Sequence, residues 1–327
     1  MGLIEDIRSK AGSSGQTVVL PESDDKRTLD ALDYILDNGI AKIILVGKEE
    51  VRKSIKAKNL KDLRLIDPET YKDTERLGAE YYELRKLKGT TPEEALETVK
   101  KDYLTFGAML VRSGAAAGFV AGANHTTADT VRVALRCLKI DRNIGVVSGA
   151  FLMVVPNSPY GEKGAFLFAD CGVNPEPNAR QLSGIARSSA DLFKKLTGKT
   201  PVVAFLSYSS KGSAAGPLVD KMREAVERAR EASPGLLIDG EFQVDSAIVP
   251  EVAAIKCPGS EVAGKANVLI FPDLNSGNIS YKITQRLSNA RAVGPLLLGF
   301  TKPASDLSRG CDAEDIVDAA AITALRA

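Results

Sequence analysis

Short apolar segments of the kind that form buried strands alternate with helical patterns along almost the whole chain. A strand is predicted at 17–21, an amphipathic helix at 25–37 and the next strand at 41–47. Further strands are predicted at 117–121, 143–147, 165–169, 202–208, 236–239, 267–271 and 292–299, and further helices at 178–196 and 216–232. Strands separated by helices favour parallel sheets that are covered on both faces. The predicted fold class is therefore α/β, with three layers of the αβα type.

Length and charge narrow the classes of protein to which the chain can belong. With 327 residues, of which 44% are hydrophobic and 26% charged, the chain is long enough for two domains. Its 43 Lys and Arg nearly balance 42 Asp and Glu, so overall charge gives no reason to expect binding to nucleic acid or a membrane surface. The sequence has no secretory signal pattern and no apolar stretch of transmembrane length, so we expect a cytoplasmic protein.

Cysteine and histidine usage excludes several kinds of site. The cysteines at 137, 171, 257 and 311 have no paired spacing, which indicates neither a zinc knuckle nor a disulfide framework. His125 is the single imidazole, so a multi-histidine metal site is impossible and any Ser-His or Cys-His mechanism must use that residue. No metal site is predicted, and proton transfer is expected to fall to a carboxylate. His125 itself is also readily explained as a hydrogen-bonded loop residue.

The last thirty residues place a hydroxyl, a guanidinium and a carboxylate near a glycine. Asp312 is a suitable N-cap for a helix that continues to Leu325, and Asp315 falls in its first turn. Ser308 and Arg309 then lie on the loop entering that helix, where backbone donors and an arginine can bind an anion. A simpler interpretation is that both aspartates only cap the helix and that Arg309 is a solvated charge.

A second candidate anion site follows the strand at 117–121. The chain crosses a loop of small residues and enters a helix carrying Thr127, Thr130 and Arg132. The two hydroxyls could cap this helix and contact an oxyanion, and Arg132 lies in its first turns. Capping alone explains the pattern equally well. Arg286, on a helix that follows the strand at 267–271, supplies a further positive charge.

Seven segments, in order, resemble the phosphate acetyltransferase (phosphotransacetylase) family over nearly the whole chain: LPESDDKRTLDA, YYELRKLKGTTPEEA, VAGANHTTADTVR, LSYSSKGSA, DGEFQVDSAIVPEVA, PGSEVAGKANVLIFPDLNSGNISYKITQRL and DLSRGCDAEDIV. The resemblance implies reversible acetyl transfer between coenzyme A and inorganic phosphate. It also implies a homodimer and two α/β domains with the active site in the cleft between them. We expect the first domain at 1–146 plus 301–327 and the second at 147–300.

The resemblance also implies roles for particular residues. The family's catalytic serine, adjoining arginine and carboxylate match Ser308, Arg309 and Asp315. Its further functional arginines match Arg85, Arg132 and Arg286, and Thr127 and Thr130 would help to hold the phosphoryl group. Acetyl-CoA, phosphate and acetyl phosphate are then substrates, and no tightly bound cofactor is expected. Some relatives have a cysteine near the site where this chain has Ser158, so sensitivity to thiol reagents at that position is not expected.

The chemistry of the expected reaction constrains these roles. Asp315 is the candidate base for the coenzyme A thiol. That thiol has a pKa near 8.5, about 4.6 units above that of an ordinary Asp, so complete proton transfer to Asp315 would cost roughly 6 kcal/mol. Desolvation could raise the pKa of such a carboxyl, whereas the helix entrance would lower it. Ser308 is the candidate donor to the tetrahedral oxyanion, and Arg309 the candidate partner of the departing phosphate. Because the segment of Ser308 holds no histidine to activate it, direct thiolate attack is favoured over an acetyl-serine intermediate.

Several alternatives remain open from the sequence. A variant serving ethanolamine breakdown would run the same chemistry in another pathway. A phosphate butyryltransferase would differ mainly in the size of the acyl pocket. A noncatalytic acyl-CoA-binding regulatory module would share the fold without turnover. A metal-dependent dehydrogenase is not indicated, because the chain has no complete dinucleotide fingerprint and no cluster of metal-binding carboxylates.

Overall fold

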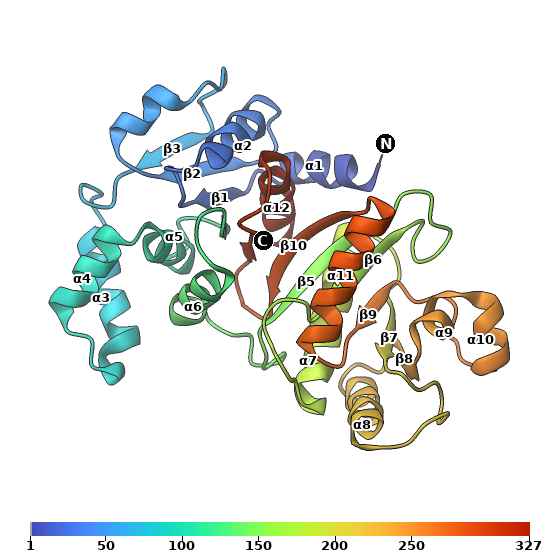
Figure 1. The fold of residues 1–327 in the computed structure, drawn as a ribbon. Helices are drawn as coiled ribbons and strands as arrows, with labels where there is room; N and C mark the ends of the chain where they lie inside the picture. Colours follow the sequence, from blue (N-terminus) through green and yellow to red (C-terminus); the bar gives the residue numbers. More distant parts are fainter. Residues whose placement is uncertain (1) are drawn as a thin grey trace. The chain divides into compact units, whose positions relative to one another are not determined.

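The computed structural model describes residues 2–327, and the chain divides into two compact units. The first unit contains the segments up to Lys139 and from Phe300 onward, and the second runs from Ile140 to Gly299. Both units combine strands with covering helices, so the predicted α/β class is confirmed (Figure 1).

The first unit contains a parallel sheet in the order β3-β2-β1-β4-β11. Its strands are β1 (Thr17–Leu20), β2 (Lys42–Val46), β3 (Leu63–Ile66), β4 (Gly118–Ala121) and β11 (Ala304–Asp306). Its helices are α1 (Leu3–Ser14), α2 (Lys26–Asp37), α3 (Thr74–Arg85), α4 (Pro92–Lys101), α5 (Tyr103–Arg112), α6 (Thr127–Cys137) and α12 (Ala313–Arg326), with short 3-10 turns at Glu49–Ser54 and Lys86–Lys88.

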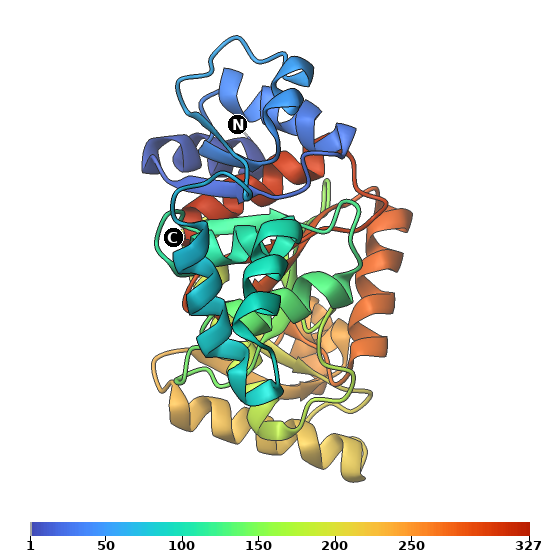
Figure 2. The same ribbon diagram turned by 90° about the vertical axis from the view of Figure 1, so that its left-hand side faces the viewer.

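Helices cover both faces of this sheet. On one face α12 packs against α1, α2 and β4, and on the other α5 packs against β1 and β4 with α6 beside it. Figure 2 shows the red C-terminal helix running alongside the blue N-terminal helices, so the two ends of the chain complete one layer. Because β11 pairs in parallel with β4, the residues that follow β1, β4 and β11 emerge at the same edge of the sheet.

The second unit contains a mixed sheet in the order β10-β5-β6-β9-β7-β8. Its strands are β5 (Ser148–Val154), β6 (Ala165–Ala169), β7 (Val202–Leu206), β8 (Leu237–Phe242), β9 (Val268–Ile270) and β10 (Arg291–Leu298). Its helices are α7 (Ala179–Thr197), α8 (Pro217–Ala232), α9 (Val244–Ile248), α10 (Pro250–Lys256) and α11 (Leu274–Ser288). Helices α7 and α8 cover one face, and α9 and α11 the other.

One predicted strand is wrong. Residues 143–147 form a turn and an extended connection, and the strand begins at Ser148, where pairing with β10 starts. Gly145 has a φ of +72°, which takes the backbone out of the extended region just before that point.

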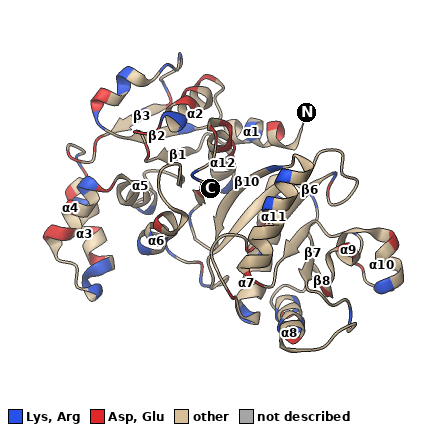
Figure 3. Cartoon of the chain, viewed as in Figure 1, with Lys and Arg blue, Asp and Glu red and all other residues tan. Residues whose placement is uncertain are grey.

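Basic and acidic segments are interspersed on the helices of both units (Figure 3). Among residues 2–327, none of the helices combines the length and apolar character that crossing a bilayer requires.

Candidate functional site

Ser308 and Arg309 lie on the loop that enters α12, and Asp315 belongs to the capping box at the start of that helix. Asp312 is the N-cap, and its carboxylate accepts from the Asp315 N–H at 2.9 Å while Asp315 accepts from the Asp312 N–H at 3.1 Å. The Ser308 hydroxyl oxygen accepts from the Gly310 N–H at 3.2 Å. That acceptance orients Oγ and leaves its own proton available to a ligand, which suits a hydrogen-bond donor.

Arg27, on α2, fixes this loop to its neighbour. Its guanidinium donates to the backbone oxygens of Arg309 at 2.7 Å, Cys311 at 3.0 Å and Ala123 at 2.5 Å. It also pairs with Asp25, the N-cap residue of α2. One side chain therefore holds the Ser308 loop beside the loop that follows β4.

The loop after β4, residues 122–125, wraps around the buried carboxylate of Glu22. Its two oxygens accept four backbone N–H groups, from Gly122, Ala123, Asn124 and His125 at 2.9, 2.8, 3.1 and 3.2 Å. One oxygen also lies 2.6 Å from Nδ1 of His125. Burial raises the pKa of Glu22, but the hydrogen bonds from His125 and the backbone outweigh it, so the pKa is lowered and the group is ionised.

The entrance of α6 lies directly after this loop. The N-cap is Thr126, whose hydroxyl accepts from the Asp129 N–H, so the prediction that Thr127 or Thr130 caps the helix is wrong. Arg132 is exposed and pairs with Asp129 at 2.5 Å. Thr130 is fully buried, so its hydroxyl lies beneath the helix entrance rather than at the surface.

Asp306, the last residue of β11, lies beneath both loops. It is fully buried, and no hydrogen bond with ordinary geometry reaches its oxygens from residues 2–327, although the Thr127 and Thr130 hydroxyls face it. A Cβ at Gly122 would lie 2.4 Å from the carboxylate, which requires glycine there. Burial raises the pKa of Asp306 to about 7.

The remaining predicted arginines lie elsewhere. Arg85 is the last residue of α3. Burial raises the pKa of Cys137, at the far end of α6, to about 12, and the charge of Arg85 partly opposes this rise. A helix rises 1.5 Å per residue, so that end lies about 15 Å from Thr127. Arg286 belongs to α11 in the second unit. Within the first unit, the loop carrying Ser308 and Arg309 therefore lies beside the loop that precedes Thr127.

The side chains present do not form a metal centre. Within residues 2–327, no group of three or more His, Cys, Asp or Glu side chains is arranged to hold an ion. All four cysteines are free thiols and buried.

Comparison with known proteins places the chain in a family. Residues 2–324 match the family described as phosphate acetyl/butaryl transferase. The chain belongs to this family. It is 51% identical over 328 residues to a phosphate acetyltransferase of Acetivibrio thermocellus, covering 100% of this chain and 98% of the relative. It is 49% identical to that of Thermoanaerobacterium thermosaccharolyticum, over the full length of both chains.

A solved structure of a family member has the same fold. A phosphotransacetylase from Streptococcus pyogenes superposes with a TM-score of 0.91 at 42% identity, covering 99% of this chain and 97% of that one. The resemblance inferred from seven sequence segments is thereby confirmed at the level of the family.

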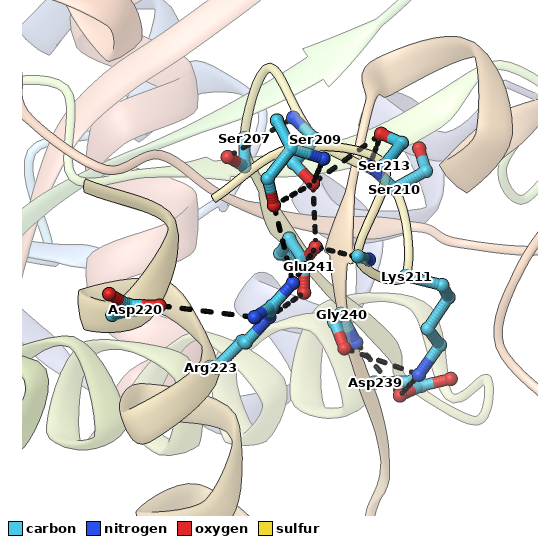
Figure 4. A network of polar contacts seen from close by, with 12 residues as sticks. Ser207, Ser209, Ser210, Lys211, Ser213, Asp220, Arg223, Asp239, Gly240 and Glu241 are labelled. Atoms are coloured by element: carbon cyan, nitrogen blue, oxygen red, sulfur yellow. Dashed lines mark hydrogen bonds and ion pairs between the residues drawn. The ribbon is translucent and has the colours of Figure 1, made fainter. Parts of the chain in front are cut away.

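A second polar cluster lies in the second unit and includes residues of the family segment LSYSSKGSA (Figure 4). Lys211 donates to Asp239 at 2.5 Å, and Arg223 donates to Glu241 at 2.9 Å. Glu241 also accepts from the Ser209 hydroxyl at 2.8 Å and the Gly212 N–H at 2.9 Å. Each cation meets a carboxylate, so the cluster is balanced in charge and holds the serine-rich loop after β7 in place.

Sequence reasoning missed Glu22, Arg27 and Asp306 as parts of the site. Glu22 follows β1 and Asp306 ends β11, so each is a carboxylate at the carboxyl end of a strand. Polar residues at that edge of a parallel sheet are a recognised signal of a site. Arg27 carried no comparable signal, because its partners are backbone oxygens distant in sequence.

Proposed function

We propose that this protein is a phosphate acetyltransferase, which moves an acetyl group reversibly between coenzyme A and inorganic phosphate. The observation that carries the proposal is the arrangement at the entrance of α12, where Ser308, Arg309 and Asp315 share one loop and capping motif. Family membership supports the same reaction.

Each group at this entrance has a task in direct transfer. The coenzyme sulfur bonds to the acetyl carbon, the Ser308 hydroxyl donates to the developing oxyanion, and the bond from carbon to the phosphate oxygen then breaks. Arg309 holds the departing phosphate, with Thr127 and Arg132 at the entrance of α6 as further partners. We assign Asp315 to orienting the thiol, since its carboxylate is held by the Asp312 N–H at a helix N-terminus.

The distant arginines would bind other parts of the substrates. Arg85 is too far from Thr127 to touch the reacting carbon, so we assign it to a remote part of the coenzyme. Thr130 is buried and would act by supporting the loop. Arg286 remains a proposed contributor to the positive surface around the substrates.

The decisive assay follows thioester absorbance with acetyl phosphate and coenzyme A. We expect turnover by the unaltered protein and a loss of about 100-fold or more in kcat for Ser308→Ala, the usual effect of removing one oxyanion donor. Ser13, an exposed helix residue that bonds only to its own helix, provides the matched control Ser13→Ala. Coenzyme binding without thioester formation would instead support the noncatalytic module.

The family description also includes butyryl transfer, which the same assay can resolve. Comparing kcat/KM for acetyl phosphate and butyryl phosphate distinguishes the two activities. We propose acetyl as the preferred group, because the relatives reported above are named as phosphate acetyltransferases.

We further propose a cytoplasmic homodimer made of two domains that correspond to the two compact units. Four free thiols suit a reducing compartment. Helix α11 exposes Ile279, Ile283 and Leu287, spaced four residues apart and so on one face. If a second copy covers this face, Ile283→Lys will shift the mass measured by light scattering from dimer to monomer, whereas an unchanged dimer would exclude this face as the contact.

A further inference from the structure

His125 and Glu22 form a pair that the reaction as proposed so far does not use. The Glu22 carboxylate is 2% exposed, and its oxygen lies 2.6 Å from Nδ1 of His125. Four backbone N–H groups complete the surroundings of that carboxylate. The imidazole is thus fixed by a buried anion, the arrangement by which acyl-transfer enzymes orient a histidine.

The pairing decides which ring nitrogen is available. An ionised carboxylate accepts hydrogen bonds only, so Nδ1 carries the proton that points to Glu22. No hydrogen bond from residues 2–327 engages the other nitrogen, Nε2, and the side chain is 38% exposed. Nε2 can therefore take up and release a proton at the surface of the loop.

The surrounding charges make this nitrogen a stronger base than an ordinary imidazole. The hydrogen bond to Glu22 raises the pKa of His125, partly opposed by burial and supported by the negative charges of Glu22, Asp102 and Asp24. Asp102 is the N-cap of α5, and Asp24 follows β1. A thiol with a pKa near 8.5 is consequently much closer in basicity to this imidazole than to a carboxylate.

Two contacts place the pair next to the Ser308 loop. Arg27 donates both to Ala123, two residues before His125, and to Arg309. A Cβ built at Gly122 would lie 2.7 Å from the backbone nitrogen of Leu307, which precedes Ser308. The loop that carries His125 therefore packs directly on the loop that carries the candidate oxyanion donor.

The reaction needs a group that both accepts and gives a proton. Thioester formation releases the thiol proton. When the bond between the acetyl carbon and the phosphate oxygen breaks, the phosphate formed must take up a proton, because fully deprotonated phosphate is a far stronger base than a thiolate. Asp315 is poorly suited to this exchange, since its carboxylate caps a helix and accepts from the Asp312 N–H. In the reverse direction the same group must take the proton from phosphate and return it to sulfur.

We propose that His125, oriented by Glu22, carries this proton, and the proposal rests on the acetyltransferase function inferred above. Nε2 accepts the thiol proton as sulfur bonds to the acetyl carbon, and the imidazolium passes it to the phosphate oxygen as the carbon to oxygen bond breaks. Hydrogen phosphate and the thioester leave, and neutral His125 is restored. Glu22 is a positioning residue that holds the ring and stabilises its transient charge.

The test compares His125→Ala and His125→Gln with the unaltered protein in the thioester assay, with and without added imidazole. General acid and base groups contribute about 100-fold to 10,000-fold, so we expect kcat to fall at least 100-fold and to recover partly with imidazole in His125→Ala. Ser308→Ala is the matched control, because imidazole cannot replace a hydroxyl. A loss below about tenfold, or a larger loss that imidazole leaves unchanged, overturns the proposal.

Glu22→Gln provides a second measurement if the alanine variant fails to fold. The rate of thiol attack requires neutral His125, so kcat/KM rises with pH through its pKa. Removing the carboxylate lowers that pKa, and the acidic limb of the profile must move to lower pH. An unmoved limb overturns the proposal. Absence of turnover in the unaltered protein would instead remove the acetyltransferase function, so the two failures are distinct.

Discussion

Replacing Arg27 with alanine tests whether one side chain holds the two loops of the site together. The guanidinium, 31% exposed, donates to the backbone oxygens of Ala123, Arg309 and Cys311. Alanine leaves all three without this donor, and nothing else on α2 replaces it at that position. The loop entering α12 then loses its tie to the loop after β4.

The magnitude follows from the number and kind of these bonds. Hydrogen bonds to a charged group are worth about 1.5 to 3 kcal/mol each, but three made by one partly exposed side chain are not additive, and water can replace some of them. We expect the free energy of unfolding to fall by about 3 kcal/mol. A displacement of about 1 Å at a reacting group can cost 100-fold in rate, so kcat should fall by about that factor.

Urea titration and the thioester assay measure the two effects on the same samples. Arg52→Ala is the matched control, since Arg52 pairs only with Glu49 on the surface and such pairs contribute at most about 1 kcal/mol. For Arg27→Lys we expect stability and kcat between those of Arg27→Ala and the unaltered protein, because a single ammonium cannot reach all three backbone oxygens. The reasoning is refuted if Arg27→Ala stays within about 0.5 kcal/mol of the unaltered protein and its kcat stays within about threefold.

Three further predictions concern other parts of the structure. Burial would raise the pKa of Glu241, but hydrogen bonds from Arg223, Gly212 and Ser209 outweigh it and lower the pKa from 4.5 to about 2. The ionised carboxylate therefore adds about 3 kcal/mol to the free energy of unfolding above pH 4.5, and this contribution is lost as the pH falls toward 2. Urea titrations between about pH 2 and 4.5 should show that the free energy of unfolding depends less on pH in Glu241→Gln than in the unaltered protein. An equal pH dependence would contradict this role of Glu241. Burial raises the pKa of Cys311 to about 11 and of Cys137 to about 12, so a disulfide reagent should label the folded protein slowly and the urea-unfolded protein fast; rapid labelling without urea would refute this. Asp312→Ala removes the capping box and should cost about 1 kcal/mol of stability while lowering kcat through Asp315, and a variant with unaltered kcat would show that the cap does not position that carboxylate.

Local sequence predicted much of the architecture because the deciding interactions are short in range. Asp312 caps α12 as its position before an apolar helical pattern indicated, and α7 and α8 lie within a residue of their predicted bounds. Capping uses a side chain and backbone groups three residues apart, and amphipathic spacing repeats within a single helix. These features are legible without knowledge of the rest of the chain.

The strand at 148–154 and the cap of α6 show where that reasoning fails. The predicted strand lay too early because the start of β5 is set by its pairing with β10, a partner more than a hundred residues away. Thr126 and Thr127 are adjacent and have the same side chain, so the sequence does not show which of them is the N-cap. In the structure Thr126 has the extended backbone of an N-cap residue, and its side chain accepts from the Asp129 N–H. Boundaries of this kind depend on tertiary contacts rather than on propensity.

The sequence alone determined the alternation of strands and helices, the family, the loop with Ser308 and Arg309, and the helix start with Asp315. Each of these depends on residues that are neighbours in the chain. Only the tertiary structure placed Glu22 against His125, about a hundred positions later in the chain, and Arg27 against Arg309. Parallel strands from distant segments end at one edge of the sheet. The contacts made there lower the pKa of Glu22 and raise that of His125, whereas burial raises the pKa of Asp306. Those properties belong to the folded surroundings, because a residue type has a fixed chemistry but no fixed pKa.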